Sequence, residues 1–151
     1  MRTVHASAVL VGAHAVLIRG ASGSGKSRLT LELLQAADRG ALPFARLVAD
    51  DRVLLLAENG RLIAQPPDPL AGLLEVRGLG ILRLPYEHAA VVRWVVDLGE
   101  ASERLPAEDA SCSIRGVTLP RFAFPSCIAA LPVLLAALPA RVARGTGIGD
   151  R

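Results

Sequence analysis

The sequence predicts a single α/β domain over residues 1–151, built as a mixed sheet with flanking helices. Three observations predict this class: two adjacent apolar segments of strand length, a glycine-rich loop directly after them, and a leucine-rich helical pattern that follows the loop. The length suits one domain with its own core. Hydrophobic residues make up 52% of the chain and aromatic residues only 3%, so Leu, Val, Ile and Ala must fill that core.

The expected elements follow one another with turn signals between them. Strands are predicted at residues 4–11, 15–18, 45–49, 53–57, 62–64, 91–96 and, as an extended segment, 117–124. Helices are predicted at residues 26–37 and 126–138, and Gly40 is expected to end the first. Asn59-Gly60 is a strong two-residue hairpin signal. Residues 65–69 (QPPDP) and the polar residues 99–113 are predicted to form loops.

Residues 73–82, LLEVRGLGIL, combine features that conflict. Apolar residues dominate the stretch and indicate burial, yet Glu75 and Arg77 stand inside it, and Gly78 and Gly80 follow. The glycines would let the backbone pass close to a ligand or another chain, and the carboxylate could bind a metal. The alternative is an ion pair between Glu75 and Arg77 on an exposed edge, which periodicity alone favours.

Residues 20–27, GASGSGKS, match the pattern G-x-x-x-x-G-K-[ST] in full, between a predicted strand and a predicted helix. Glycines let successive backbone N–H groups cradle phosphate oxygens, and the helix N-terminus adds partial positive charge. Lys26, the only lysine of the chain, would reach the β- and γ-phosphates, and the Ser27 hydroxyl would bind Mg²⁺. A chance match is expected in roughly one chain in a few hundred. The predicted ATP-binding residues are Gly20, Ala21, Ser22, Gly23, Ser24, Gly25, Lys26 and Ser27.

Asp50 and Asp51 lie just beyond a short apolar strand, where a protein with a phosphate loop often presents an Asp to the metal and where a kinase needs a base. Adjacent residues of a strand point to opposite faces, so the two carboxylates are expected to differ in role. The alternative is a solvated turn before Arg52. His5, on the first strand, and Arg104 are left open by the residues alone, since a lone strand histidine is more often a core residue than a catalyst.

Composition argues against several classes of function. The net charge is +3, but the basic residues are scattered singly, which argues against nucleic-acid binding. The longest apolar run, residues 128–138, is too short for a membrane span and contains Pro132. Cys112 and Cys127 form no CxxC pair, which favours a reducing cytoplasm.

Taken together and in this order, His5, GASGSGKS, LVADD, LLEVRGLGIL and the ERLP of residues 103–106 resemble the catalytic domain of the HPr kinase/phosphorylase family. LEVRGLGI is the specific element, because the glycine-rich loop alone would only indicate a P-loop protein. The resemblance covers residues 4–124 and implies a P-loop domain of the HPr kinase/PEP carboxykinase-like type. It implies an ATP- and Mg²⁺-dependent kinase that phosphorylates a serine of HPr, the phosphocarrier protein of the sugar phosphotransferase system, or of an HPr-like carrier.

The resemblance also implies roles for matching residues. Asp51 would take the proton from the target serine hydroxyl, His5 would be the partner of that acid, and Arg104 would stabilise charge on the transferred group. The implied catalytic residues are Asp51, Asp50, His5, Arg104 and Lys26, and the implied metal ligands are Ser27 and Glu75.

The chain departs from the family pattern in three places. The residues before His5 are few, so the family's separate N-terminal domain is expected to be missing, and Arg28 follows GKS where an acidic residue is usual. Uncharged residues 125–132 stand where the family has an arginine- and glycine-rich loop, which argues against the reverse phosphorolysis. This pattern is similar to the short form found in alphaproteobacteria.

Three functions therefore compete at this point. The first is the HPr serine kinase, expected to be a cytoplasmic homo-oligomer with neither a nucleic acid nor a membrane as a partner. The second is a nucleotide-binding regulatory module that senses ATP with little catalysis. The third is a P-loop kinase for a small metabolite, although the sequence shows no lid and no arginine cluster for such a substrate.

Overall fold

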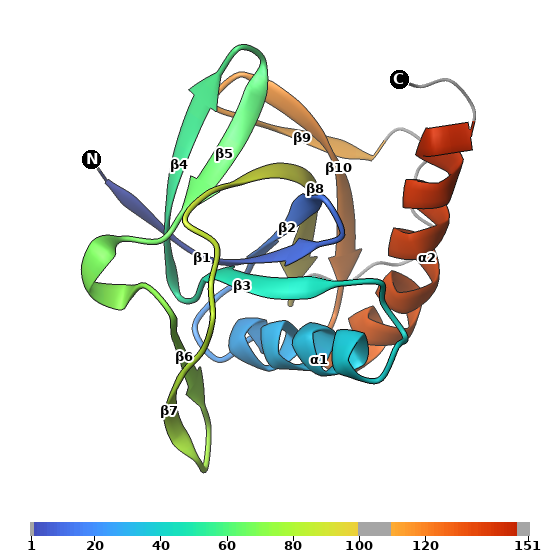
Figure 1. Cartoon of the computed structure of the whole chain (residues 1–151). Coiled ribbons are helices and arrows are strands. Elements are labelled where there is room, and N and C mark those ends of the chain that lie inside the picture. The colour runs from blue at the N-terminus through green and yellow to red at the C-terminus, as the bar shows by residue number, and fades with distance from the viewer. Residues whose placement is uncertain (1, 100–109, 148–151) are drawn as a thin grey trace.

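The computed structural model describes residues 2–99 and 110–147, with side chains described as far as residue 139. The helices are α1 (Lys26–Asp38), a short 3-10 helix η1 (Asp68–Leu70) and α2 (Cys127–Gly147). The strands are β1 (Thr3–Val11), β2 (His14–Arg19), β3 (Ala45–Ala49), β4 (Arg52–Glu58), β5 (Arg61–Gln65), β6 (Leu73–Val76), β7 (Gly80–Arg83), β8 (Ala90–Leu98), β9 (Ser111–Ile114) and β10 (Val117–Phe124). The predicted mixed sheet with flanking helices is confirmed (Figure 1).

Within the described residues, eight strands form one mixed sheet, and β6 and β7 form a separate two-stranded hairpin. β8 pairs with β2 and β10 in parallel, whereas the other pairs of the large sheet are antiparallel. The pairings β1–β2, β2–β8, β8–β5, β5–β4 and β4–β1 close on themselves, so the sheet curves into a ring. This closure leaves β1, β2 and β8 in the middle of the molecule.

The central strands are buried on both faces, and each face has its own apolar cluster. Along β2, Val16 and Ile18 face the helices, whereas Ala15 and Leu17 face the inside of the ring. The helix-side cluster includes Trp94 together with the buried faces of α1 and α2. Strands covered on both sides read as continuous apolar runs, which explains the high hydrophobic content.

The helix α1 begins at the end of the glycine-rich loop and ends as predicted. Its buried residues recur at helical spacing and are Lys26, Leu29, Thr30, Leu33 and Ala36. Gly40 has a φ of 85° and its N–H donates to the carbonyl of Ala37, so it ends the helix in the left-handed conformation that glycine allows. Lys26 therefore lies on the face that packs against the sheet.

The turn signal at Asn59-Gly60 is confirmed. Both residues have positive φ, 55° and 76°, and they join β4 to β5 with Glu58 paired to Arg61. Two consecutive positive φ angles define the type I′ turn that suits the twist of a hairpin.

Two expectations about the elements are corrected by the structure, and one open question is decided. The predicted loop at residues 99–113 contains the start of β9, which pairs with β10 across a tight turn at Arg115 and Gly116, with φ of 49° and 82°. The second helix runs past its predicted end because Pro139, like Pro132, is accommodated inside it. Residues 73–82, for which the sequence left burial and an exposed edge open, form an exposed hairpin in which Leu74 is the buried residue of β6.

The structure also bears on membrane insertion. Among the described residues, no helix combines the length and the apolar character that crossing a bilayer requires.

Candidate active site

The glycine-rich loop, residues 20–27, connects β2 to α1 at the carboxyl end of β2. Gly20, Gly23 and Gly25 have φ of 157°, 83° and 105°, and Gly25 is the N-cap of α1. A Cβ at Gly20 would lie 2.5 Å from the Oγ of Ser24 and 2.9 Å from the carbonyl oxygen of Leu98. The loop is therefore folded too tightly at Gly20 to admit a side chain there.

Lys26 folds back over this loop. Its Nζ donates to the carbonyl oxygens of Gly20 at 2.9 Å and Ala21 at 3.1 Å, and the residue is only 6% exposed. Burial lowers the pKa of Lys26, while the nearby carboxylates of Asp51 and Asp50 oppose that shift. The ammonium is thus held at the mouth of the loop, between the loop and the two acids.

Asp50 is the most densely bonded carboxylate of the site and is only 7% exposed. Its Oδ1 accepts hydrogen bonds from the hydroxyls of Ser27 and Ser7, both at 2.8 Å, and its Oδ2 lies 3.0 Å from the Ser27 hydroxyl. The backbone N–H of Glu75 also donates to Oδ2, at 3.4 Å. Asp50 therefore joins the start of α1, the strand β1 and the root of the β6–β7 hairpin.

Asp51 has a different environment from its neighbour. Its side chain is 61% exposed, and Nε2 of His5 lies 3.0 Å from its Oδ1. Its backbone N–H donates to the Ser7 hydroxyl at 3.2 Å, and its φ is 70°. The two acids lie in different environments, but the alternation of strand residues is not the reason; the difference in role stays a prediction. Asp50 and Asp51 form the turn between β3 and β4, and the positive φ of Asp51 separates them.

A buried ion-pair cluster lies beside the start of the loop. Asp97, at 5% exposure, accepts hydrogen bonds from Nε and Nη2 of Arg19 at 2.8 and 2.9 Å, and another from Nε of Arg121. Burial alone would raise the pKa of Asp97, but the hydrogen bonds from Arg19 and Arg121 outweigh it and lower that pKa. Because Arg19 immediately precedes Gly20, this cluster anchors the first residue of the loop to β8 and β10.

The structure brings most of the predicted site residues to one place. Hydrogen bonds connect His5 with Asp51, and Asp50 with Ser27 and with the backbone of Glu75, while Lys26 lies close enough to both acids to feel their charge. Arg104 lies outside the described residues. Sequence reasoning missed Ser7, which bonds both acids. Its spacing from His5 was the available signal, because residues two apart on a strand share a face.

Oxygen donors for a cation lie around Asp50. They are the Asp50 carboxylate and the Ser27 hydroxyl, and the backbone N–H of the exposed Glu75, a further acid, donates to Asp50. In the described part of the chain, no three His, Cys, Asp or Glu side chains gather closely enough to hold a metal by themselves. Mg²⁺ commonly takes one or two carboxylates and completes its shell with phosphate oxygens and water, so the donor set suits a metal that arrives with a nucleotide.

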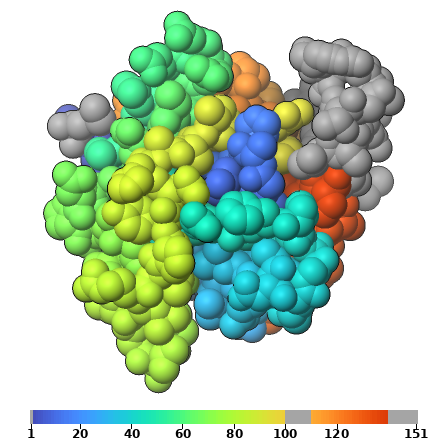
Figure 2. Space-filling view, viewed as in Figure 1, coloured from blue at the N-terminus to red at the C-terminus, as the bar shows by residue number. Residues whose placement is uncertain are grey.

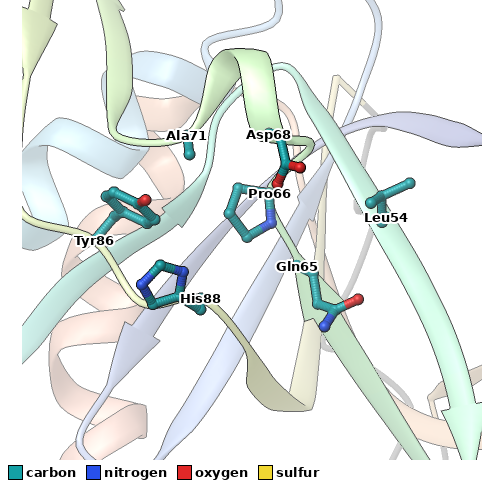
Figure 3. Close-up of a pocket in the computed structure, with 7 residues that line it drawn as sticks. All are labelled: Leu54, Gln65, Pro66, Asp68, Ala71, Tyr86 and His88. Carbon is teal, nitrogen blue, oxygen red and sulfur yellow. The ribbon is translucent and has the colours of Figure 1, made fainter.

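An open pocket of about 500 Å³ lies between the ends of β4 and β5 and the segment that leads into β8 (Figure 3). The rings of Tyr86 and His88 meet edge to face at a centroid distance of 4.9 Å along one side of it. Gly72 packs against Tyr86, since a Cβ there would lie 3.0 Å from the ring. The pocket thus borders the root of the β6–β7 hairpin, and the contacts around Asp50 do not include its lining residues.

Comparison with known proteins identifies the family. The model of the HPr Serine kinase C-terminal domain matches residues 1–127, so the chain belongs to this family. The structure is similar to that of the Hpr(Ser) kinase/phosphatase from Coxiella burnetii, with a TM-score of 0.76 and 28% sequence identity. That match covers 97% of this chain and 100% of the other.

Curated relatives agree with this assignment. The HPr kinase/phosphorylase of Streptococcus thermophilus is 35% identical over 136 residues, covering 82% of this chain and 42% of the relative. The enzyme of Clostridium tetani is 46% identical over 70 residues, which are 46% of this chain and 21% of the relative. The chain therefore spans about two fifths or less of the length of these curated relatives.

Proposed function

We propose that the protein is an ATP- and Mg²⁺-dependent kinase that phosphorylates a serine of HPr or of an HPr-like phosphocarrier protein. One observation carries the proposal. A buried carboxylate, Asp50, bonds the hydroxyl of Ser27, while its neighbour Asp51 is exposed and bonded to His5. A phosphoryl transfer needs both kinds of acid, one beside the metal and one that an acceptor hydroxyl can reach. The proposed acceptor, a serine of HPr, is taken from the names of the relatives.

The loop has the features that a bound triphosphate requires. The Oγ of Ser24 is buried and has no hydrogen-bond partner among the described residues, and a buried hydroxyl normally finds one. Lys26 donates hydrogen bonds to two loop carbonyls, and it can replace these bonds with bonds to phosphate oxygens at little cost in free energy. With a nucleotide in place, Ser24 and the loop N–H groups would donate to its phosphates, and Lys26 would hold the transferred group.

The remaining residues have separate proposed roles in the phosphoryl transfer. Ser27, Asp50 and Glu75 would hold Mg²⁺, which neutralises charge on the phosphates when bound. Asp51 would accept the proton of the serine hydroxyl as that oxygen attacks, and His5 would orient the carboxylate through its hydrogen bond. Ser7 would keep Asp50 and the backbone of Asp51 in fixed positions. Arg104 keeps its proposed role as a stabiliser of the transferred charge.

We propose that the forward reaction dominates. Residues 125–132, PSCIAALP, contain no charged side chain, and phosphorolysis needs an anion site for free phosphate. A cytoplasmic location, a homo-oligomeric state and one catalytic domain over residues 1–151 belong to the same proposal. The free thiols of Cys112 and Cys127 support the reducing compartment.

The test is transfer from γ-labelled ATP to purified HPr of the same organism with Mg²⁺, comparing wild type with Asp51→Asn. We expect phosphoserine on HPr, located by mass spectrometry, and a loss of about 10²- to 10⁴-fold in kcat for the variant. The affinity for ATP should change far less than kcat, because the hydrogen bonds described for Asp51 go to His5 and Ser7 rather than to the loop. Asp38→Asn, an exposed acid at the end of α1, is the matched control and should keep full activity.

Two results would contradict the proposal. Wild type that binds ATP but transfers nothing to HPr would favour the regulatory module instead. If the Asp51→Asn variant remained active, a residue other than Asp51 would have to accept the proton of the serine hydroxyl.

A further inference from the structure

The β6–β7 hairpin exposes an unusual amount of apolar surface. Leu79 and Ile81 are each 68% exposed, although large apolar side chains elsewhere in the described structure are mostly buried. Residues 73–83 project from the rest of the molecule (Figures 1 and 2), so these two side chains face solvent at a protruding edge. Exposed apolar side chains gathered on one projecting element indicate an interaction site.

The hairpin is anchored at its root and unsupported at its tip. Leu74 is fully buried, and the N–H of Leu84 donates to the carbonyl of Gly72 at 2.7 Å. At the tip, Gly78 and Gly80 have φ of 87° and 116°, and no described atom lies within 4 Å of where a Cβ would stand. The turn geometry, rather than packing against the body, therefore sets the shape of the tip.

The exposed side of the hairpin leads directly to the candidate active site. Ile81 pairs with Glu75 across the two strands, so their side chains share one face. The backbone N–H of Glu75 donates to Asp50, the buried acid of the site. A molecule that covers Ile81 therefore also lies beside Glu75, a proposed metal ligand on the neighbouring strand.

The charges around the apolar pair are basic. Arg77 and Arg83 are exposed and flank Leu79 and Ile81 along the chain, and these four residues are called the hairpin patch below. Among the described residues, Glu75 is the acidic side chain of this hairpin, and metal binding would neutralise it. The patch therefore suits an apolar surface with acidic residues at its edge.

We propose that the hairpin patch docks the acceptor protein, with an apolar and acidic surface next to its target serine. This inference rests on the proposed kinase function. A protein acceptor must bring a serine hydroxyl to Asp51, which is 61% exposed, and the patch is the protruding apolar surface beside that point. A second copy of this chain seated on Ile81 would cover Glu75 and block the approach that the reaction needs, so the acceptor is the better occupant.

The test measures acceptor kinetics for the double variant Leu79→Ser/Ile81→Ser. We expect the KM for HPr to rise at least about tenfold, because truncating two central apolar contacts of an interface removes a large share of its affinity. The kcat at saturating HPr should stay within about twofold, and the KM for ATP should not change. Ile128→Ser is the matched control, since Ile128 is also 68% exposed but lies on α2.

A charge variant tests the proposal independently. Arg77→Glu should raise the KM for HPr about three- to tenfold at low salt, and high salt should reduce the difference. Thermal unfolding should be unchanged in all three variants because the substituted side chains are exposed. Arg77→Glu keeps the test valid if the serine variant folds poorly.

The outcomes separate this inference from the proposed function. Wild type that does not phosphorylate HPr contradicts the proposed function. Wild type that is active, with hairpin variants of unchanged KM for HPr, contradicts the docking surface alone. Hairpin variants that lose self-association in light scattering, with an unchanged KM for HPr, would assign the patch to a second copy.

Discussion

Two regions contribute to the candidate active site, and they are built in opposite ways. The loop corner consists of residues 20–27 with Ser7 and Asp50. Its polar residues Ser7, Lys26 and Asp50 are buried, and Asp50 accepts hydrogen bonds from Ser7 and Ser27. The 73–83 hairpin contributes Glu75 and the hairpin patch. At its tip Leu79 is 68% exposed, and a Cβ at Gly78 or Gly80 would meet no described atom within 4 Å. The corner lies on strands that are covered on both faces, whereas the hairpin leaves the body after its root.

The difference follows from what each region must do. Phosphoryl transfer depends on atoms held within a fraction of an ångström, so its groups belong on rigid, packed elements. Recognition of another protein needs reach and accessible apolar surface, which a packed element cannot offer. Asp50 and Glu75 illustrate the contrast, since both are proposed at the metal but one is buried and the other exposed. Substitutions in the two regions should therefore affect different measurements.

The largest effect is expected from Lys26→Met in the loop corner. The phosphoryl transfer rate should fall about 10³-fold or more, because the variant lacks the ammonium that bonds the loop carbonyls and would hold the transferred group. The fold should survive, since methionine keeps the apolar stem that packs on the sheet. Steady-state kinetics and thermal unfolding measure the two effects. Arg39→Met, an exposed cation at the end of α1, should change neither.

A smaller effect, on stability, is expected from Asp97→Asn at the base of the loop. The free energy of unfolding should fall by about 2 kcal/mol, because two partly buried guanidiniums lose their shared counter-charge. Chemical denaturation measures this loss, and Glu58→Gln at the exposed end of β4 should cost less than about 0.5 kcal/mol. Equal losses in both variants would show that the Asp97 cluster does not stabilise the corner.

The pH dependence of this loss has a defined sign. The pKa of Asp97 in the folded protein is lower than its ordinary value of 3.8. A lowered carboxyl pKa stabilises the folded state above the ordinary value, and that stability is lost as the pH falls through the lowered pKa. The difference between wild type and Asp97→Asn should thus be constant from pH 7 to 5 and shrink below about pH 4.

The smallest effects come from a pair of glycines with the same backbone strain. Gly25 and Gly80 have φ of 105° and 116°, so Ala strains both, by about 1 kcal/mol. At Gly25 the new Cβ would also lie 3.1 Å from the Cβ of Cys127, whereas at Gly80 it would meet nothing. Gly25→Ala should therefore lower thermal stability more than Gly80→Ala. The reverse order would contradict the contrast between a packed corner and an unsupported tip.

Much of the fold could be predicted because its signals are local. The turn at Asn59-Gly60 needs only two residues that tolerate positive φ, and α1 needs only its apolar spacing and Gly40. β9 was missed because its residues, SCSI, are not typical of a strand and its turn places Arg115 at positive φ. The pairing with β10, rather than local propensity, makes this segment a strand.

The sequence by itself determined the glycine-rich loop, the order of most elements and the family resemblance that the comparisons confirm. Only the tertiary structure decided that Asp50 bonds Ser27 while Asp51 meets His5, and that Ser7 bonds both acids. These contacts join residues 23 to 46 positions apart along the chain. They depend on the pairing of β1 with β3 and β4, including a register shift between Ala8 and Val9. No short stretch of sequence encodes such a register, because it is set by the packing of both faces of the sheet at once.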